Sequence, residues 1–210
     1  MKAPHYLHPG LNLGMTDRKS HEKAGEVIFG FWIFLMSDLV LFAALFATYA
    51  AMSTQGIAQG PGPSEVFNLG PALIETLVLL VSSFTFGFAM LAMKYSANRR
   101  VLLTWLGLTA LLGITFLAFE LHDYYVMIVT KNAWPQTSGF LSAYYLLTGT
   151  HAVHVSAGLL WMIVLAIQVM TIGLDTAVKL RLMRLALFWH MLDIVWVAIF
   201  TFVYLFGVAA

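Results

Sequence analysis

Five long apolar segments constrain the fold of this chain more than any other feature. They run approximately over Val27–Met52, Pro71–Met93, Val101–His122, Gly139–Thr171 and Leu182–Val208. Each reaches the roughly 20 residues that an α-helix needs to cross a lipid bilayer. We therefore expect an all-α fold, an integral membrane bundle of five helices formed by residues 27–210. The more polar residues 1–26 are expected to form a separate N-terminal segment.

Composition agrees with a membrane protein and excludes several kinds of site. Hydrophobic residues make up 60% of the chain and charged residues 10%, whereas soluble domains carry about 25% charged residues. The chain has no cysteine, which excludes disulfides, thiolate metal sites and iron–sulfur clusters. We see no internal repeat and no soluble domain.

The basic residues predict the orientation. With five spans, ten of the eleven lysines and arginines lie on one side of the membrane, and only Lys131 lies on the other. The ten are Lys2, Arg18, Lys19, Lys23, Lys94, Arg99, Arg100, Lys179, Arg181 and Arg184. The positive-inside rule then predicts a cytoplasmic N-terminus and a periplasmic C-terminus.

Local signals place loops between the segments. Residues 55–63 are rich in Gly and Pro, which indicates a turn-rich loop. Pro135 precedes the fourth segment and Gly173 follows it, as expected for a helix start and stop. That segment would be about 50 Å long, so it must tilt, kink or project from a core of about 30 Å.

The last segment carries a polar and aromatic stripe on an otherwise apolar helix. At 100° per residue the stripe spans about a third of the circumference. It consists of Trp189, Asp193, Trp196, Phe200 and Tyr204, with His190 at its edge. Because an ionisable group in hydrocarbon costs about 2.5 kcal/mol or more, we expect the stripe to face protein.

Other ionisable residues also lie inside the segments. The acids are Asp38, Glu75, Glu120 and Asp193, and the histidines are His151, His154 and His190. Such residues have two interpretations. They form a proton path or a cofactor site, or they form buried hydrogen bonds between helices. For each acid taken alone we favour the hydrogen bonds. Glu75 and Glu120 lie near the same end of consecutive antiparallel segments, so they could meet. Small pairs such as Ala43/Ala47, Ser83/Gly87 and Ala152/Ser156 are expected to allow close helix approach.

The histidines raise the question of haem or metal. His154 and His190 lie at different depths on their segments, so a haem clamped between them is disfavoured. His151 and His154 are three residues apart on one helix, but no further ligands are evident beside them. We therefore expect no catalytic, cofactor-binding or metal site in this chain. The expected buried polar and helix-packing residues are Asp38, Glu75, Glu120, His151, His154, Trp189, His190, Asp193 and Trp196.

The stripe also predicts one specific contact. Asp193 and His190 are three residues apart, so they share a helix face and can reach each other or a common partner. We expect the Asp193 side chain to accept a hydrogen bond within the bundle, with His190 or a tryptophan as the favoured donor.

Motifs in all five segments resemble subunit III of the haem–copper terminal oxidases. In the last two segments they are Phe188, Trp189, His190, Asp193, Val195, Trp196, Tyr204 and Gly207, and Thr148, Gly149, Thr150, His151, His154 and Gly158. In the middle segment they are Gly113, Phe116, Glu120, Asp123 and Tyr124. In the first two segments they are the run 30–38, Leu41, Phe42 and 46–49, and Glu75, Thr76, Leu79, Leu80, Ser82 and Ser83.

The motifs of the first two segments are similar to the quinol-oxidising branch, in particular cytochrome o (bo-type) ubiquinol oxidase. The cytochrome c branch commonly has two further helices, carries Glu where Asp38 stands and carries Gln where Glu120 stands. This last difference weakens any proton-carrying role for Glu120.

The resemblance implies a non-redox accessory subunit of a proton-pumping quinol oxidase in the bacterial inner membrane. Haem and copper would belong to the partner subunit I, with subunits II and IV in the same complex and phospholipid between helices. The subunit would support assembly and stability. The main alternative is subunit III of a menaquinol or cytochrome c oxidase. A proton-coupled carrier and a haem-b membrane anchor are less favoured alternatives. No nucleic-acid partner is expected.

Overall fold

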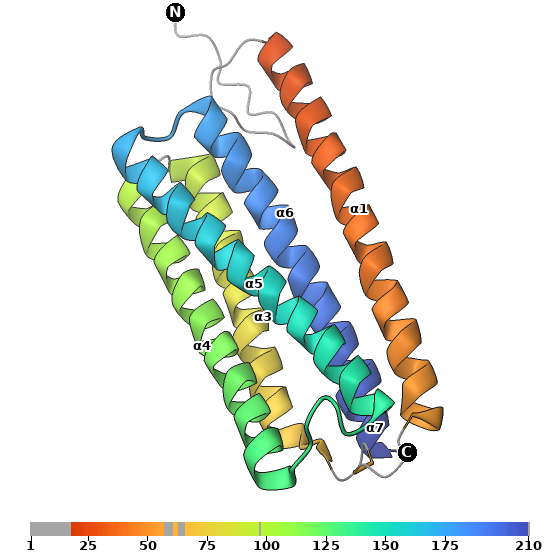
Figure 1. Ribbon diagram of the computed structural model, residues 1–210. Helices are drawn as coiled ribbons and strands as arrows, with labels where there is room; N and C mark the ends of the chain where they lie inside the picture. The colour runs from red at the N-terminus through yellow and green to blue at the C-terminus, as the bar shows by residue number, and fades with distance from the viewer. Residues whose placement is uncertain (1–17, 57–60, 63–65, 97, 210) are drawn as a thin grey trace, which may run out of the picture.

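The computed structural model describes residues 18–56, 61–62, 66–96 and 98–209 and consists of antiparallel helices (Figure 1). The five long helices are α1 (Arg18–Gln55), α3 (Leu69–Leu91), α4 (Arg99–Lys131), α5 (Gly139–Thr171) and α6 (Thr176–Ile199). No strand occurs in these ranges. The π-helical segment η1 (Ala92–Ser96) extends α3, and η2 (Phe200–Leu205) and α7 (Phe206–Ala209) extend α6.

Five of the described helices are long and apolar enough to span a membrane, which agrees with the five expected segments. They cover Ala24–Thr54, Leu69–Tyr95, Arg99–Lys131, Gly139–Thr171 and Thr176–Val208. Helix α1 begins before the apolar segment does, so the expected boundary between residues 26 and 27 lies inside a helix. Most of the expected loop over residues 55–63 lies outside the described residues.

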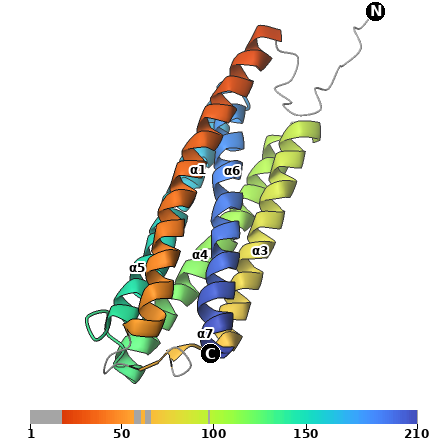
Figure 2. The ribbon, with the colours of Figure 1, turned by 90° about the vertical axis from the view of Figure 1, so that its right-hand side faces the viewer.

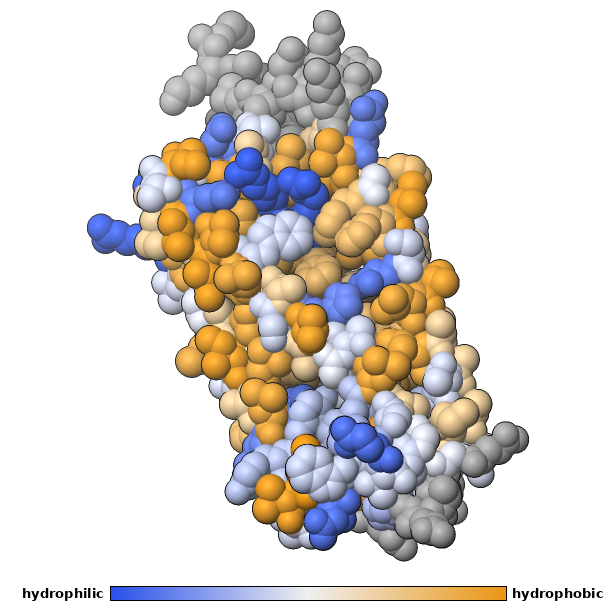
Figure 3. Space-filling view, viewed as in Figure 1, coloured by the Kyte–Doolittle hydropathy of each residue, from blue (hydrophilic) through white to orange (hydrophobic). Residues whose placement is uncertain are grey.

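The antiparallel arrangement separates the charges as expected. One end, which we call the basic end, carries Lys94, Arg99, Arg100, Lys179, Arg181 and Arg184. The other end, which we call the C-terminal end, holds α7, the start of α3 and Lys131 at the end of α4 (Figure 1). Hydrophobic side chains cover much of the face in Figure 3, and hydrophilic ones gather towards its two ends.

Local caps explain where helices begin and end. Ser138 accepts a hydrogen bond from the Leu141 N–H at 3.1 Å, and Asn98 accepts one from the Arg100 N–H at 3.0 Å. Such side chains satisfy the free N–H groups of a first helical turn. After α5 the chain reverses at Gly173, whose φ of 96° suits a residue without a Cβ. The expected stop at Gly173 is therefore confirmed.

Helix α1 lies at the edge of the bundle, whereas α6 lies among the others. Helix α6 packs against α1, α3 and α5, and α4 packs against α3 and α5. Helix α1 packs on α5 and α6 (Figure 2). The core is thus the group α3–α6, to which α1 adds an outer layer.

Close helix approach occurs at two glycines that face one tryptophan. A Cβ on Gly113 would lie 2.8 Å from the Trp189 ring, and one on Gly158 would lie 3.2 Å from it. Trp189 is fully buried, so its large ring requires neighbours without side chains. Of the expected pair Ser83/Gly87, Ser83 is buried and hydrogen-bonded to His190 of α6 at 2.6 Å, whereas a Cβ on Gly87 would meet nothing within 4 Å.

The other small pairs lie mostly at the surface of the bundle. Ala43, Ala47 and Ser156 are exposed, and Ala152 is only half-buried. Small residues at helical spacing therefore do not locate the tight crossings in this bundle.

Candidate functional site

The two tryptophans of α6 bind α3 through their ring nitrogens. Trp189 Nε1 donates to Ser82 Oγ, and Trp196 Nε1 donates to Thr76 Oγ1, each at 3.1 Å. All four residues are buried. The polar-aromatic stripe therefore faces protein at these positions, as expected, and it fixes α6 on α3. We call these four residues the tryptophan face.

His190 and Asp193 meet a common residue that sequence reasoning did not identify. Ser83 Oγ on α3 is hydrogen-bonded to His190 Nδ1 at 2.6 Å and also lies within hydrogen-bonding reach of Asp193. The expectation of His190 or a tryptophan as the partner of Asp193 was wrong. The two indoles donate to α3 instead, and the His190 Nδ1 atom is already bonded to Ser83. Asp193 Oδ1 has no partner in the part of the chain described.

Asp38 and His154 connect α1 to α5. His154 Nε2 lies 3.4 Å from Asp38 Oδ1, and His154 Nδ1 is hydrogen-bonded to the Thr150 carbonyl oxygen at 2.7 Å. The Phe42 ring packs beside His154 with centroids 5.3 Å apart. This contact joins the outer helix to the core, at a place where both side chains are partly exposed.

His151 is packed among aromatic rings. It is fully buried, and neither ring nitrogen has a hydrogen-bond partner within the described ranges. The rings of Trp196, Phe116 and Phe42 lie around it, with centroid distances of 5.3, 5.9 and 6.3 Å. Its position is that of a core residue.

Across the residues that the structure describes, no group of three or more His, Asp and Glu side chains is arranged to hold a metal ion. His154 and His190 are bonded to protein groups on different helices.

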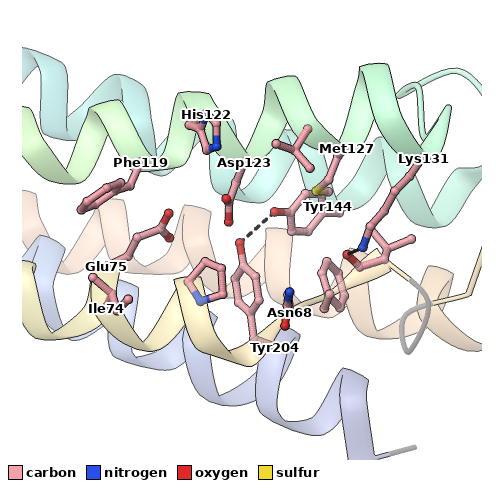
Figure 4. A pocket seen from close by; sticks show the side chains of 14 residues that line it. Asn68, Ile74, Glu75, Phe119, His122, Asp123, Met127, Lys131, Tyr144 and Tyr204 are labelled. Carbon is pink, nitrogen blue, oxygen red and sulfur yellow. Dashed lines mark hydrogen bonds between the residues drawn. The ribbon is translucent and has the colours of Figure 1, made fainter.

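The second polar region is a cavity of about 340 Å³ at the C-terminal end, which we call the acid pocket (Figure 4). Glu75 enters it from α3 and Asp123 from α4, and Tyr144 and Tyr204 line it with their hydroxyls hydrogen-bonded at 2.8 Å. Sequence reasoning missed Tyr144, because nothing in the chain links it to Tyr204, which is 60 residues away.

Glu75 lines this pocket, and Glu120 of α4 lies close to Glu75. Each is 1% exposed, and none of their carboxyl oxygens has a hydrogen-bond partner among the described residues. Glu75 lies close enough to Glu120 and Asp123 to be influenced by their charges. The expected meeting of Glu75 and Glu120 therefore occurs. Glu120 also lies within hydrogen-bonding reach of the Tyr124 hydroxyl, whereas Glu75 has no such neighbour in the described part of the chain.

A third region is an apolar groove of about 550 Å³ towards the basic end. Trp32 of α1, Met90 beside η1 and Met183 of α6 line it, with Lys94 and His190 as its polar members. Its walls therefore come from the outer helix and from the core, and its chemistry suits an amphiphile.

Comparison with known proteins agrees with this architecture. The family model for cytochrome c oxidase subunit III matches residues 16–208. The chain belongs to the cytochrome c oxidase subunit III family. It is 47% identical to cytochrome bo(3) ubiquinol oxidase subunit 3 of Pseudomonas aeruginosa, over 96% of this chain and 95% of the relative.

Two further relatives show how widely the subunit III likeness extends. The corresponding subunit of Pseudomonas putida is 45% identical over 90% of this chain and 89% of the relative. A probable quinol oxidase subunit 3 of Staphylococcus haemolyticus is 38% identical over 91% and 94%. These similarities cover all five spans, so the resemblance drawn from the motifs is confirmed.

Proposed function

We propose that this chain is subunit III of a proton-pumping respiratory quinol oxidase that oxidises ubiquinol and reduces dioxygen to water. The observation that carries the proposal is its 47% identity, at nearly full length on both sides, to a subunit of a ubiquinol oxidase. The proposal extends the activity named for that relative to the complex in which this chain takes part.

Within that complex the chain serves assembly and stability rather than electron transfer. Haem and copper belong to the large subunit I, and subunits II and IV complete the complex. The arrangement of the buried polar residues supports this role, because Trp189, Trp196 and His190 hold α6 on α3, and His154 lies against Asp38 on α1. These residues are accordingly assigned to helix packing.

The orientation proposed is a cytoplasmic basic end and a periplasmic C-terminal end, in a multi-pass protein of the bacterial inner membrane. The distribution of Lys and Arg between the two ends supports it. A reporter fused after Ala210 should be active only in the periplasm. Activity of that reporter in the cytoplasm would contradict the proposed orientation.

The apolar groove supports binding of a phospholipid to this subunit. Its apolar lining suits acyl chains, and Lys94 suits a phosphate group. Mass analysis of lipids retained by the purified complex should show a phospholipid that is lost on enlarging Ala186, which lines the groove. Retention unaffected by Ala186→Trp would place the lipid elsewhere.

The decisive experiment is purification of the tagged chain from native membranes in mild detergent, followed by mass identification of its partners. We expect a haem–copper subunit, haem absorption bands and oxygen consumption driven by ubiquinol. Parallel assays with menaquinol and reduced cytochrome c distinguish the alternative oxidases. Haem bands retained by this chain alone would indicate a haem-b anchor. Transport by this chain without partners would indicate a proton-coupled carrier.

The histidines provide a second test of the non-redox assignment. Replacement of His151, His154 or His190 by Gln should leave the haem spectrum of the assembled complex intact. Loss of a haem signal at normal subunit stoichiometry would contradict the assignment.

A further inference from the structure

The acid pocket contains a strong hydrogen-bond acceptor for which the described chain supplies no donor. Glu75 is almost fully buried, and both of its carboxyl oxygens are without a partner among the residues described. Its side chain points from α3 into the pocket, towards the side of α4 that carries Asp123 (Figure 4). Withdrawal of a polar group from water without a new hydrogen bond is unfavourable. A donor from outside the chain would remove this cost.

The tyrosine hydroxyls and the lysine around the pocket already have acceptors. The Tyr144 and Tyr204 hydroxyls share a hydrogen bond of 2.8 Å. The Tyr124 hydroxyl donates to Thr148 at 2.8 Å, and Lys131 Nζ donates to the Val66 carbonyl oxygen at 2.5 Å. His122 and Asn68 also line the pocket, but neither is hydrogen-bonded to Glu75, whose carboxyl oxygens have no partner among the described residues. A neighbouring molecule can therefore supply the donor that Glu75 lacks.

The shape and lining of the pocket restrict what that donor can be. A volume of about 340 Å³ admits a long side chain, since a water molecule's share of liquid volume is about 30 Å³. Ile74 and Phe119 line it and are also 53% and 41% exposed on the outer surface, so an occupant can enter between them. The polar part of the lining consists of two carboxyl groups, Glu75 and Asp123, together with Asn68, His122, Lys131, Tyr144 and Tyr204. An occupant that serves the two carboxyl groups combines an apolar stem with a cationic, donor-rich end.

A guanidinium group meets these requirements. It presents five N–H donors in a planar fork, has no acceptor, and binds carboxylates through two parallel hydrogen bonds. Its three-carbon stem packs along apolar walls such as those of Ile74 and Phe119. An amine of a lipid head group carries a phosphate close by, which would lie near the same carboxyl groups of Glu75 and Asp123.

We propose that the acid pocket receives an arginine side chain from a neighbouring subunit of the oxidase, which docks across α3 and α4 at the C-terminal end. This inference rests on the proposed membership of an oxidase complex. It assigns Glu75 and Asp123 to the interface between subunits, and it places that interface on the side of the bundle away from α1.

The first test is photo-crosslinking in the intact complex in native membranes. A photoreactive phenylalanine analogue in place of Phe119 should form an adduct with another oxidase subunit, at or beside an arginine. The same analogue in place of Phe84, which is exposed on α3 away from the pocket, is the control. An adduct from position 119 with lipid alone would overturn the proposal.

The second test measures how firmly the crosslinked subunit is retained. Glu75→Gln should weaken its retention at high salt by about tenfold or more, because it leaves a buried arginine without its charged partner. Asp123→Asn should weaken it less, because Asp123 is only half-buried. Glu26→Gln, an exposed acid of α1 near the basic end, should have no effect. Unchanged retention in both pocket variants would contradict the proposal.

A double-mutant cycle separates direct pairing from a general structural effect. Replacement of the crosslinked arginine by Gln should give the same loss as Glu75→Gln, and the combined variant should lose little more. Fully additive losses would show that the two groups do not touch. If no oxidase subunit accompanies the unaltered chain, the proposed function fails; if the subunits accompany it and the cycle is additive, only this inference fails.

Discussion

The tryptophan face and the acid pocket lie in one helix bundle, but they differ in whether their buried polar groups are hydrogen-bonded within the chain. At the tryptophan face each indole N–H meets a hydroxyl of α3, and both partners come from this chain. In the acid pocket the carboxyl group of Glu75 has no partner in the described chain. The contrast indicates that the tryptophan face is satisfied by this chain alone, whereas the acid pocket leaves a carboxyl group for a partner from outside.

The largest expected effect tests whether the tryptophan face holds the bundle together. Trp189→Ala removes a fully buried indole and should destabilise the chain by about 3–5 kcal/mol. The measurement is the temperature at which half of the chain aggregates, in detergent extracts of membranes that contain this chain without its partners. Trp134→Ala, at a position that is 52% exposed, should change that temperature little.

A smaller loss of stability is expected when Trp189 is kept but a larger side chain is placed against its ring. Gly113→Leu places a side chain where the Trp189 ring lies 2.8 Å from the Cβ position, and such overpacking costs about 1–3 kcal/mol. Gly107→Leu on the same helix has nothing within 4 Å of its Cβ and is the matched control. Equal aggregation temperatures for the two variants would show that Trp189 can move aside.

Loss of one hydrogen bond should have a still smaller effect. Thr76→Val keeps the shape of the side chain but leaves the Trp196 N–H without its acceptor. We expect a loss of about 1 kcal/mol, since interhelical hydrogen bonds in membranes are modest. Thr104→Val, which affects an exposed threonine bonded to the backbone of its own helix, is the control and should aggregate at the temperature of the unaltered chain.

The smallest effect is expected in the acid pocket when the chain is studied without its partners. Glu75→Gln removes no internal hydrogen bond, and an amide costs less to bury than a carboxylate. The aggregation temperature should therefore stay the same or rise slightly. A fall greater than that of Thr76→Val would reveal an internal partner and would erase the contrast between the two regions.

The overall fold follows from the sequence because its signals are local. The apolar lengths predict five spans, and the positions of Lys and Arg predict which helix ends lie together. The spacing of Trp189 and Trp196 on one helical face also predicts that both face protein. Each of these inferences needs only the geometry of one helix and the cost of polar groups in lipid.

Contacts between helices are less predictable. Asp193 and His190 share a helix face, yet both meet Ser83 of α3, and nothing within α6 indicates that serine. The tight crossings occur at Gly113 and Gly158 because both face Trp189. A pattern of small residues within one helix cannot show which bulky side chain lies opposite.

The acid pocket is an intermediate case. The positions of Glu75 and Glu120 near the same end of consecutive antiparallel helices predict that they meet. The hydroxyl pair of Tyr144 and Tyr204 was not predictable. It depends on how α5 packs against the end of α6, where the π-helical segment η2 alters the direction in which side chains point.

The position of α1 also determines the order in which the bundle can be completed. Helix α1 is the first to be synthesised, yet it packs on α5 and α6, which leave the ribosome last. The hairpin of α3 and α4 pairs neighbours in the chain and can close early. Asp38 is therefore synthesised well before its partner His154. Helix α1 can pack on the core only after the final third of the chain, which forms α5 and α6, has been synthesised. Addition of α1 to the core is thus a late event in the biogenesis of this protein.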